Sequence, residues 1–434
     1  METMTHALLD ELRWRGLLYQ HTEGVAALLQ RGVASGYVGF DPTATSLHVG
    51  SLVPIMALVH LQRSGHRPIA LVGGGTGLIG DPSGRPSERT LMSAEQVEIN
   101  VRGIRAQLER FLDFEDSSGN GTGAILVDNA EWLVSMRTVE FMRDVGKHFT
   151  VNYMLQKESV KTRLDGGISY TEFSYMLLQA FDFLELYRRY GALLQLGGSD
   201  QWGNITAGIE LIRRTEASEA QAATLPLVTT ASGTKFGKSE AGAVWLDASL
   251  TSPYEFYQFW LNIDDRDVGR YLRYFTLMGR DEIEALDQAT EARPERREAQ
   301  QALARDMTAR VHGDEPLRAA IEVSEFLFGR LEPDSLSRAA LEVLSAEAPF
   351  VEVNESAVSD GAQGLDVFKL LVAAGLAPSN GASRRLLEQG GISLNKRKLG
   401  ATERYVDASA VLLQGSYLIL GKGKRDYAVV RVIR

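Results

Sequence analysis

The sequence predicts an α/β protein in which a doubly wound parallel sheet is followed by an α-helical domain and a small basic module. Three observations support this prediction. Strand-like and helix-like segments alternate through residues 1–220, strand patterns are absent between Ser252 and Leu331, and the last 70 residues are basic. Alternation of strands with helices is typical of parallel sheets covered by helices. A chain of 434 residues is also long enough for two or three domains.

The elements of the sheet can be assigned in order from short apolar runs and helix start signals. Ser46 is expected to cap a helix over 47–63, and a capping box formed by Ser93 and Gln96 opens a helix that ends near Leu112. The predicted strands cover residues 37–40, 68–72, 124–127 and 192–196, with residues 225–229 as a candidate fifth. Ligands of such sheets bind beyond the carboxyl ends of the strands, where glycine-rich turns stand in this chain.

Composition narrows the class of protein. Apolar residues make up 44% of the chain, and no apolar run approaches the ~18 residues of a membrane span. Residues 1–16 are too charged for a secretory signal. Cysteine is absent, which excludes disulfides and a cysteine nucleophile and fits a reducing cytoplasm, so a cytoplasmic location is expected.

Charge is distributed unevenly along the chain. The formal net charge is −10, but residues 365–434 hold twelve Lys/Arg and five Asp/Glu, a balance of +7, so the remainder carries −17. A basic appendage on an acidic body is typical of proteins that bind a polyanion such as nucleic acid. A small domain with a solvated basic face is the alternative. Residues 332–363 are acidic, contain Pro333 and Pro349, and are interpreted as a linker.

Two glycine-rich segments imitate nucleotide-binding motifs. Gly75–Gly80 has the G-x-G-x-x-G spacing, which keeps a nucleotide-binding oxidoreductase as an alternative. The residues that follow, Asp81–Pro86, form a turn sequence rather than a helix start, and an acidic residue ending a second strand about 20 residues later is missing. Gly233–Ser239 is one residue too short for a P-loop and precedes a predicted strand, so it is interpreted as a mobile basic loop.

Residues 171–190 form a predicted helix that is apolar nearly all round, as in a buried helix. Tyr175, Gln179 and Asp182 are spaced i, i+4 and i+7 and therefore share one face. A buried amide or carboxylate without a partner costs about 1–3 kcal/mol or more. These side chains are therefore expected to bind either a polar ligand or one another, and spacing alone leaves both possibilities open.

Several segments resemble the signatures of one enzyme family. Leu47–Ser51 resembles the "HIGH" motif of class I aminoacyl-tRNA synthetases, and Lys235–Ser239 resembles their "KMSKS" loop. Residues 364–434 resemble the RNA-binding module of a small-subunit ribosomal protein (the type-four protein). Three further segments are similar to motifs of bacterial-type tyrosyl-tRNA synthetases: Gly39–Ala44, Gly80–Gly84 and Gly198–Asn204. The resemblance covers nearly the whole chain, with the motifs in the expected order.

The resemblance implies an activity and a domain plan. L-tyrosine is activated with ATP to tyrosyl-adenylate and pyrophosphate and is then transferred to the 3′-terminal ribose of tRNA(Tyr). Mg²⁺ accompanies ATP as a counter-ion, no tightly bound protein metal is expected, and the enzyme is a homodimer without a membrane partner. The implied domains are a Rossmann-type catalytic domain (1–230), the KMSKS-like loop and following strand (231–250), an α-helical anticodon-contacting domain (251–331), the linker (332–363) and the RNA-binding module (364–434).

Site residues follow from the same resemblance. Tyr37 and Asp182 are implied to bind the substrate phenol. The α-ammonium group is implied to bind Asp81, Tyr175 and Gln179, with Gln201 near the acyl group. The implied ATP-binding set is Gly39, Asp41, His48, Gly198, Asp200, Lys238 and Ser239. The implied catalytic set around the phosphates is Thr43, His48, Arg85, Arg89, Lys235 and Lys238. The candidate RNA-binding residues are Arg384, Arg385, Lys396, Arg397, Lys398, Lys422, Lys424 and Arg425.

The chemistry implied is in-line attack of the tyrosine carboxylate on the α-phosphorus, which requires positioning and cations rather than a protein nucleophile. The sequence departs from the family pattern at Ser51, where the motif usually ends in His, at Pro86, where a Lys is frequent, and at Ser239, where some relatives have Thr. A non-catalytic RNA-binding protein with a synthetase fold is a further alternative.

Overall fold

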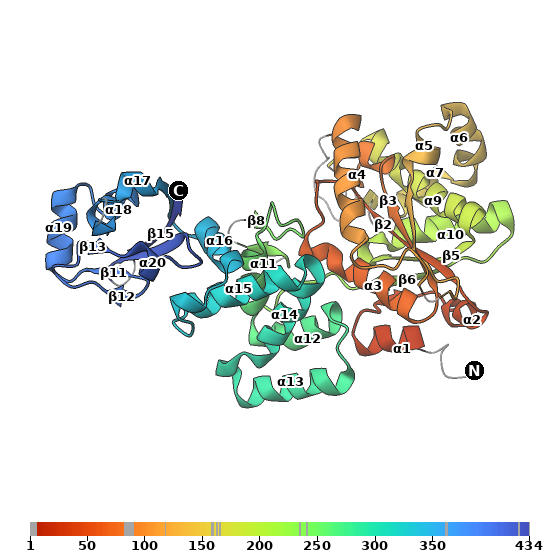
Figure 1. The fold of residues 1–434 in the computed structure, drawn as a ribbon. Coiled ribbons are helices and arrows are strands. Elements are labelled where there is room, and N and C mark those ends of the chain that lie inside the picture. The colour runs from red at the N-terminus through yellow and green to blue at the C-terminus, as the bar shows by residue number, and fades with distance from the viewer. Residues whose placement is uncertain are drawn as a thin grey trace. The chain divides into compact units, whose positions relative to one another are not determined.

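The computed structural model describes residues 7–81, 91–117, 119–157, 160–161, 164, 166–233, 236–239, 242–360, 363–423 and 426–433. The chain forms two compact units (Figure 1). Unit 1 comprises Met1–Thr251 and Phe259–Val311, and unit 2 comprises Ser252–Gln258 and His312–Arg434. Each unit is considered by itself. No described helix is long and apolar enough to cross a membrane.

Unit 1 is built on a six-stranded sheet with the order β1-β6-β5-β2-β3-β4, in which only β1 is antiparallel to its neighbour. The strands are β1 (Gln20–His21), β2 (Ser35–Phe40), β3 (Arg67–Val72), β4 (Ile125–Asp128), β5 (Ala192–Gly198) and β6 (Gln221–Leu225). The predicted parallel α/β sheet is thereby confirmed. The candidate strand at 225–229 is wrong, because β6 ends before Pro226, which has no N–H to offer a neighbouring strand.

The order of the strands creates a switch point between β2 and β5. The chain leaves β2 towards β3 on one side and leaves β5 towards β6 on the other, although β2 and β5 are direct neighbours. Their register pairs Tyr37 with Gln195. In open α/β sheets, ligands bind beyond the carboxyl ends of strands at such a point.

The helix after β2 starts differently from the prediction. A short 3₁₀ turn, η1 (Val49–Ser51), precedes α3 (Leu52–Arg63), and the Nδ1 atom of His48 caps η1 by accepting from the N–H of Gly50 at 2.9 Å. The expected Ser46 cap is wrong. The Ser46 hydroxyl instead accepts from the Gln107 amide at 2.9 Å and from the backbone N–H of Asp247 at 3.1 Å.

The second predicted helix is α4 (Ala94–Leu108). Ser93 caps it by accepting from the N–H of Gln96 at 3.2 Å, but the Gln96 side chain donates to Asn100 instead of closing the capping box. The helix lies so close to the turn after β2 that a Cβ at Gly103 would come within 2.0 Å of the Thr45 carbonyl oxygen. A glycine at this position therefore allows the close approach.

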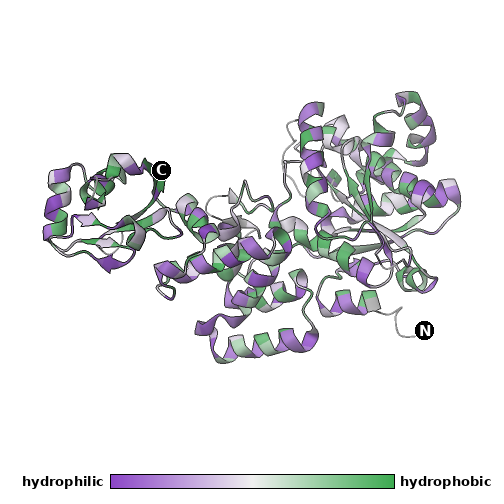
Figure 2. Ribbon diagram, viewed as in Figure 1, coloured by the Kyte–Doolittle hydropathy of each residue, from purple (hydrophilic) through white to green (hydrophobic). Residues whose placement is uncertain are grey.

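The buried helix predicted over 171–190 is α9 (Tyr170–Tyr190), capped by Ser169 and terminated by Gly191 at φ +65°. It packs with α10 (Trp202–Glu216) and the sheet in one hydrophobic core that includes Phe183, Leu186 and Leu211. Between β4 and α9, the described residues form the short helices α5 (Ala130–Leu133), α6 (Thr138–Asp144) and α7 (Val151–Leu155). Helices of both units carry apolar and polar residues on different faces (Figure 2), as expected of amphipathic helices.

The stretch predicted to be helical is divided between the two units. It contains α11 (Pro253–Leu261), α12 (Asp265–Phe275), α13 (Arg280–Ala292), α14 (Glu298–His312) and α15 (Asp314–Leu327). Just before it, strands β7 (Lys238–Ser239) and β8 (Gly242–Ala243) form an antiparallel pair.

Unit 2 ends in an α+β module. Its sheet has the order β12-β11-β14-β15-β9, and β9 runs parallel to β15. The strands are β9 (Phe350–Asn354), β11 (Ile392–Leu394), β12 (Arg397–Lys398), β14 (Tyr417–Lys422) and β15 (Asp426–Ile433), with α18 (Val367–Ala373) and α19 (Asn380–Glu388) beside them. The segment interpreted as a linker contains α16 (Arg338–Glu347) and β9. Apolar side chains of both elements pack into the hydrophobic cores of unit 2, which explains why the segment is ordered into a helix and a strand.

Candidate active site

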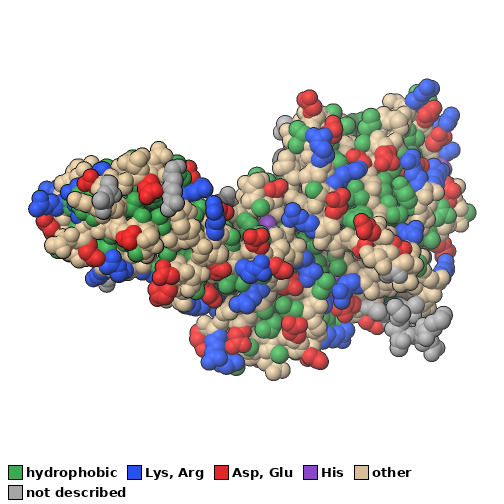
Figure 3. Space-filling model, in the orientation of Figure 1, with side chains coloured by type: hydrophobic (Ala, Val, Ile, Leu, Met, Phe, Trp, Pro, Cys, Tyr) green, Lys and Arg blue, Asp and Glu red, His purple; other side chains and the backbone are tan. Residues whose placement is uncertain are grey.

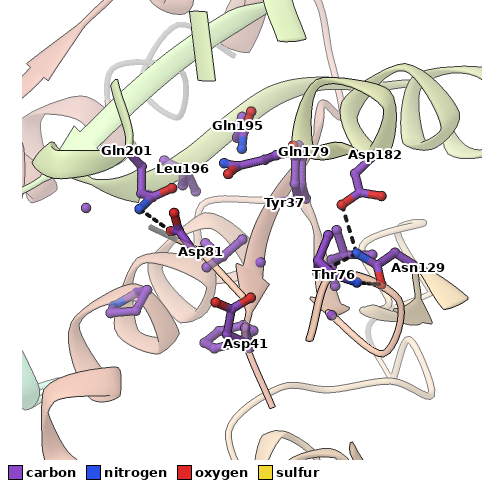
Figure 4. Close-up of a pocket in the computed structure, with 18 of the residues that line it drawn as sticks. Tyr37, Asp41, Thr76, Asp81, Asn129, Gln179, Asp182, Gln195, Leu196 and Gln201 are labelled. Atoms are coloured by element: carbon purple, nitrogen blue, oxygen red, sulfur yellow. Dashed lines mark hydrogen bonds between the residues drawn. The ribbon is translucent and has the colours of Figure 1, made fainter. Parts of the chain in front are cut away.

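A pocket lies at the switch point between β2 and β5, with α9 along one wall (Figure 4). Its lining brings together all the residues implied to bind tyrosine and part of the set implied to bind ATP. These are Tyr37, Gly39, Asp41, Asp81, Tyr175, Gln179, Asp182, Gly198 and Gln201. The polar face recognised on the helix 171–190 therefore faces a cavity rather than the apolar core alone.

Asp182 forms the deep, polar end of this pocket. Its side chain is buried, and its two carboxylate oxygens accept hydrogen bonds from Asn129 Nδ2 and Trp132 Nε1, each at 2.8 Å. Burial raises the pKa of Asp182 to about 7, against the opposing effect of these two donors. A carboxylate has about four acceptor positions, so Asp182 keeps capacity for a further donor from a ligand.

Tyr37 stands beside Asp182 at the same end of the pocket. Only 1% of its side chain is exposed, and its hydroxyl makes no hydrogen bond within the described part of the chain. Burial, followed by the charge of Asp182, raises the pKa of Tyr37 well above its ordinary value, so the hydroxyl keeps its proton. A buried hydroxyl facing a cavity is expected to find its partner in a bound polar group.

The opposite side of the pocket is also polar (Figure 4). Gln201 donates to Asp81 at 2.8 Å, and Asn204 donates to Gln179 at 3.0 Å. The hydroxyl of Tyr175 donates to Asp41 at 3.3 Å. Carboxylate and amide oxygens thus gather here, which suits a ligand group that carries positive charge and several N–H donors.

Sequence reasoning missed three polar side chains of the pocket, Asn129, Gln195 and Thr76. Asn129 donates to both Asp182 and the Thr76 hydroxyl, and it accepts from the N–H of Gly75 at 2.7 Å. One signal was available for Asn129: it directly follows β4, and ligands of such sheets bind beyond the carboxyl ends of the strands. A polar Gln195 inside an apolar strand is another, whereas the contact of Trp132 with Asp182 has no local signal.

The turn Gly75–Gly80 serves this pocket and not a dinucleotide. It contains the 3₁₀ turn η2 (Thr76–Leu78) in place of the start of an α-helix, and its backbone is tied to Asn129. The structural context required for a dinucleotide fingerprint is therefore missing at this turn.

His48 lies outside the pocket lining and forms an isolated antiparallel bridge with Trp245, in the segment after β8. The backbone N–H of Val49 donates to Val244 at 2.9 Å, and that of Leu246 donates to Leu47 at 2.9 Å. The ring of His48 stands edge-on to Trp245, with the ring centres 6.2 Å apart. The two predicted signature segments, which are almost 190 positions apart in sequence, are thus neighbours in space.

The structure describes only some of the remaining residues that were predicted to bind ATP or RNA. Thr43 is exposed on the turn after β2, and Asp200 lies next to Gly198 after β5, where burial raises the pKa of its carboxyl group. Arg85, Arg89, Lys235, Lys424 and Arg425 lie outside the described residues, as do the side chains of Lys238 and Ser239.

The candidate RNA-binding residues are not equivalent in the module. The Lys396 ammonium donates to the backbone carbonyls of Phe326 and Leu331, each at 3.0 Å, and lies 4.0 Å from the Phe326 ring centre. Arg384 pairs with Glu388, and Arg397 pairs with Glu403. Arg385 and Lys398 are exposed, Lys422 is half-buried, and Lys and Arg side chains appear at the α19 end of the module (Figure 3).

Comparison with known proteins agrees with this arrangement. The family model described as tRNA synthetases class I (W and Y) matches residues 30–329, and the model for the tyrosine–tRNA ligase SYY-like C-terminal domain matches residues 345–430. The tyrosine–tRNA ligase of Roseiflexus castenholzii is 51% identical over 432 residues, covering 98% of this chain and 99% of the relative. That of Anaeromyxobacter dehalogenans is 52% identical over 425 residues, with the same coverage.

A solved structure supports the same assignment. The C-terminally truncated mitochondrial tyrosyl-tRNA synthetase of Coccidioides posadasii superposes with a TM-score of 0.64 at 32% identity, covering 72% of this chain and 90% of that one. The nucleotide-dependent oxidoreductase and the non-catalytic RNA-binding protein find no support in these comparisons.

The fold, the switch-point pocket and the paired signature segments define a class I aminoacyl-tRNA synthetase. Within this class the chain belongs to the tyrosyl-tRNA synthetase family, and its activity is that of a tyrosine–tRNA ligase.

Proposed function

We propose that the pocket holds L-tyrosine with its phenol between Tyr37 and Asp182. The buried pair formed by the Tyr37 hydroxyl and the Asp182 carboxylate carries this proposal, because the first can share a hydrogen bond with the phenol and the second can accept one. A site built to pair a hydroxyl rejects the analogue that lacks it. Tyrosyl-tRNA synthetases are themselves the best-known example of that rule, with phenylalanine as the rejected analogue.

At the other side of the pocket, Asp81, Tyr175 and Gln179 are proposed to hold the α-ammonium group, and Gln201 to lie near the acyl group. The oxygens found on that side support this orientation, since an ammonium ion is a donor only. The carboxylate of tyrosine then faces the proposed ATP site at the ends of β2 and β5.

ATP is proposed to bind next to tyrosine at the ends of β2 and β5. Gly39, Asp41, Gly198 and Asp200 would hold adenosine, because a carboxylate is a natural partner for ribose hydroxyls. The phosphates, with Mg²⁺ as their counter-ion, would meet residues of the turn after β2, of the two signature segments and of the segment after Asp81. These residues are Thr43, His48, Arg85, Arg89, Lys235, Lys238 and Ser239.

The first reaction is proposed to be in-line attack of the tyrosine carboxylate oxygen on the α-phosphorus of ATP, with pyrophosphate as the leaving group. The cationic side chains stabilise the charge that develops on pyrophosphate, and the tyrosine pocket positions the attacking oxygen. In the second reaction a terminal ribose hydroxyl of tRNA(Tyr) attacks the activated carbonyl and releases AMP.

The basic C-terminal module is proposed to bind tRNA, and the helical segment 251–331 to contribute to anticodon contacts. The balance of +7 in residues 365–434 supports the first role. A cytoplasmic location, where tRNA is charged for protein synthesis, is proposed together with this function.

A homodimer is proposed, with a second copy of the chain covering the region of α5, α6 and α7. Large apolar side chains are exposed on these three consecutive helices and the turns beside them: Val134 (66%), Val139 (78%), Met142 (49%) and Val151 (61%). A gathering of exposed apolar side chains of this kind marks an association surface. Val139→Asp is expected to yield a monomer in sedimentation equilibrium, whereas a monomeric wild-type protein would contradict the dimer.

Tyrosine-dependent pyrophosphate–ATP exchange tests the proposed site. Tyr37→Phe and Asp182→Asn are expected to raise the KM for tyrosine about tenfold or more, with the KM for ATP nearly unchanged. Tyr190→Phe, on the same helix as Asp182 but outside the pocket lining, is the matched control. A KM for tyrosine within twofold of wild type in both pocket variants would show that this end of the pocket does not bind the phenol.

A further inference from the structure

We call the KMSKS-like loop, Lys235–Ser239, the KFGKS loop after its sequence. The segment that leads into this loop is attached to helix α12. The backbone N–H of Ala231 donates to Asp267 Oδ2 at 2.8 Å, and the hydroxyl of Tyr271 donates to the carbonyl of Thr229 at 3.2 Å. Asp267 is 3% exposed, so its carboxylate is committed to these internal contacts. Two residues one turn apart on the same helix face thus hold a main-chain donor and a main-chain acceptor ahead of the loop.

Arg270 completes the attachment. Its guanidinium donates both to the carbonyl of Thr229 at 2.6 Å and to Asp267 Oδ1 at 2.5 Å. The buried Asp267 carboxylate therefore lies between a backbone N–H and a guanidinium that is 40% exposed, and removing either donor leaves a buried charge with less compensation. We call the three residues Asp267, Arg270 and Tyr271 the α12 clamp.

Inside the loop, Phe236 is inserted between aromatic rings of α11 and α12. It is 4% exposed and stacks on Phe275 with an interplanar angle of 14° and a centroid distance of 5.3 Å. The rings of Tyr271 and Trp260 follow at 4.8 and 5.9 Å. Aromatic pairs at these distances add about 0.5–1.5 kcal/mol each beyond the burial of their area. We call the three rings of Trp260, Tyr271 and Phe275 around Phe236 the Phe236 seat. Tyr271 therefore belongs to both the α12 clamp and the Phe236 seat.

The far side of the loop is attached to the His48 segment. The carbonyl of Gly237 accepts from the N–H of Val244 at 3.0 Å, and a Cβ at Gly237, which has φ +82°, would come within 2.7 Å of Val49. Of the described residues, Thr229 and Ala231 contact α12, Phe236 lies among aromatic rings of α11 and α12, and Gly237 lies beside Val49. Since one residue spans at most about 3.6 Å, Lys238 cannot lie more than two such steps from the seat of Phe236.

We propose that the α12 clamp and the Phe236 seat are positioning devices for Lys238 of the KFGKS loop in the activation step. This inference rests on the proposed role of Lys238 at the leaving pyrophosphate. Misplacement of a catalytic group by about 1 Å can cost 100-fold in rate, even when the change lies far from the chemistry. Asp267 and Tyr271 then act on the reaction through the loop and contact neither tyrosine nor ATP.

Two matched pairs of variants test this. Asp267→Ala removes the clamp carboxylate, and Asp265→Ala removes a carboxylate of the same helix that accepts from Gln300 instead. Tyr271→Phe removes the hydroxyl that holds Thr229, and Tyr274→Phe removes a hydroxyl on the same helix for which the described residues show no hydrogen bond to the loop. In pre-steady-state activation, Asp267→Ala is expected to lower the rate about tenfold and Tyr271→Phe about threefold, with tyrosine affinity within twofold of wild type. Both controls are expected to keep the wild-type rate.

A double-mutant cycle with Lys238→Ala separates positioning from general damage. If Asp267 acts through the loop, adding Asp267→Ala to Lys238→Ala lowers the rate by less than twofold; independent action would multiply the two effects. If Asp267→Ala does not fold, as judged by its unfolding transition, Tyr271→Phe replaces it in the cycle. Equal rates for clamp variants and controls, beside a slow Lys238→Ala, would overturn the inference alone. A wild-type rate for Lys238→Ala would instead overturn the proposed role of the loop, and the inference with it.

Discussion

At the scale of single residues, Asp182 shows how one carboxylate is kept available for a ligand. Its oxygens accept from Asn129 and Trp132, and these donors favour the charged form, while burial disfavours it and raises the pKa to about 7. The protonated and ionised forms of the Asp182 carboxyl group are therefore similarly populated near neutral pH. A phenol that donates to Asp182 tips this balance towards the ionised form.

The raised pKa of Asp182 predicts a pH dependence of tyrosine binding. Because the ionised form is the better acceptor for a hydrogen bond from the phenol proposed to bind here, tyrosine affinity is expected to fall about tenfold between pH 8 and pH 6, where a group with a pKa of about 7 becomes protonated. In Asp182→Asn the affinity should be lower but flat over this range. Titration calorimetry at several pH values measures it, and a wild-type affinity independent of pH would contradict the prediction.

The raised pKa of Asp182 also affects stability: rising pH is expected to strengthen tyrosine binding but to lower the free energy of unfolding. The pKa of Asp182 is higher in the folded protein than its ordinary 3.8, so the folded state binds more protons than the unfolded state between about pH 4 and pH 7. Stability from this group is present below pH 4 and is lost as pH rises through 7. Asp182→Asn is therefore expected to gain stability relative to wild type on going from pH 4 to pH 8, measured by urea unfolding. A difference that does not change with pH would refute this account.

Ser51 offers a second test at this scale. It directly precedes α3, and its backbone N–H donates to the carbonyl of His48 at 2.8 Å. If this position faces the leaving pyrophosphate, a histidine there would donate a stronger hydrogen bond to it than a serine would. Ser51→His is therefore expected to accelerate adenylate formation several-fold, equivalent to roughly 1 kcal/mol, with unchanged tyrosine affinity. If Ser51→Ala equals wild type and Ser51→His is slower in single-turnover measurements, the position is a structural spacer.

At the scale of elements, α4 illustrates a packing contact that depends on a missing side chain. A Cβ at Gly103 would overlap the Thr45 carbonyl at 2.0 Å, so α4 and the turn after β2 touch through backbone. That turn carries Thr43 and leads to His48. The position of a helix thus determines where a signature segment lies.

Gly103→Ala is accordingly expected to destabilise the protein by about 1–3 kcal/mol, because the overlap forces α4 away from the turn. Gly381→Ala is the matched control, since Gly381 is also helical and a Cβ there meets nothing closer than Ser379 Oγ at 3.9 Å. There the change is expected to stabilise by up to about 1 kcal/mol, as alanine favours helices. Denaturant unfolding of both variants is the measurement, and equal effects would contradict the packing argument.

At the scale of the whole molecule, the C-terminal module cannot be treated as a simple tail. Its strands share a hydrophobic core with α15 and α16, in which Val323 and Leu344 pack with Tyr417 and Val429. Lys396 adds bonds to the end of α15. Removing the module would therefore expose part of this core, so substitutions on the surface are the better test of its role.

Replacing Arg385 and Lys398 together by Ala is expected to weaken tRNA binding and to make it less dependent on salt. The slope of the logarithm of the binding constant against the logarithm of the salt concentration becomes shallower by about 0.7–0.9 for each phosphate that is no longer neutralised. Pyrophosphate–ATP exchange should be unchanged. Lys396→Ala is expected to act differently, lowering stability because its bonds to the end of α15 are removed. Filter binding at several salt concentrations decides, and undiminished tRNA affinity in the double variant would contradict a role of these two residues.

Much of this organisation was predictable from the sequence by itself. Periodicity placed the main strands and the buried helix 170–190, the spacing of Tyr175, Gln179 and Asp182 predicted one polar face, and the charge count separated the basic module. These features are local, because they depend on residues a few positions apart, and local patterns are what strand and helix geometry impose on a sequence.

Only the tertiary structure decided which distant residues meet. Asn129 and Trp132 reach Asp182 from 53 and 50 positions away, Ser46 is diverted from capping by contacts with Gln107 and Asp247, and the loop of Phe236 is seated on α12. No periodicity encodes such pairs, since each joins residues of elements that are far apart in the sequence and meet only in the folded chain. The sequence by itself determined the elements and the family; the packing of those elements decided the partners that give each site residue its charge and its position.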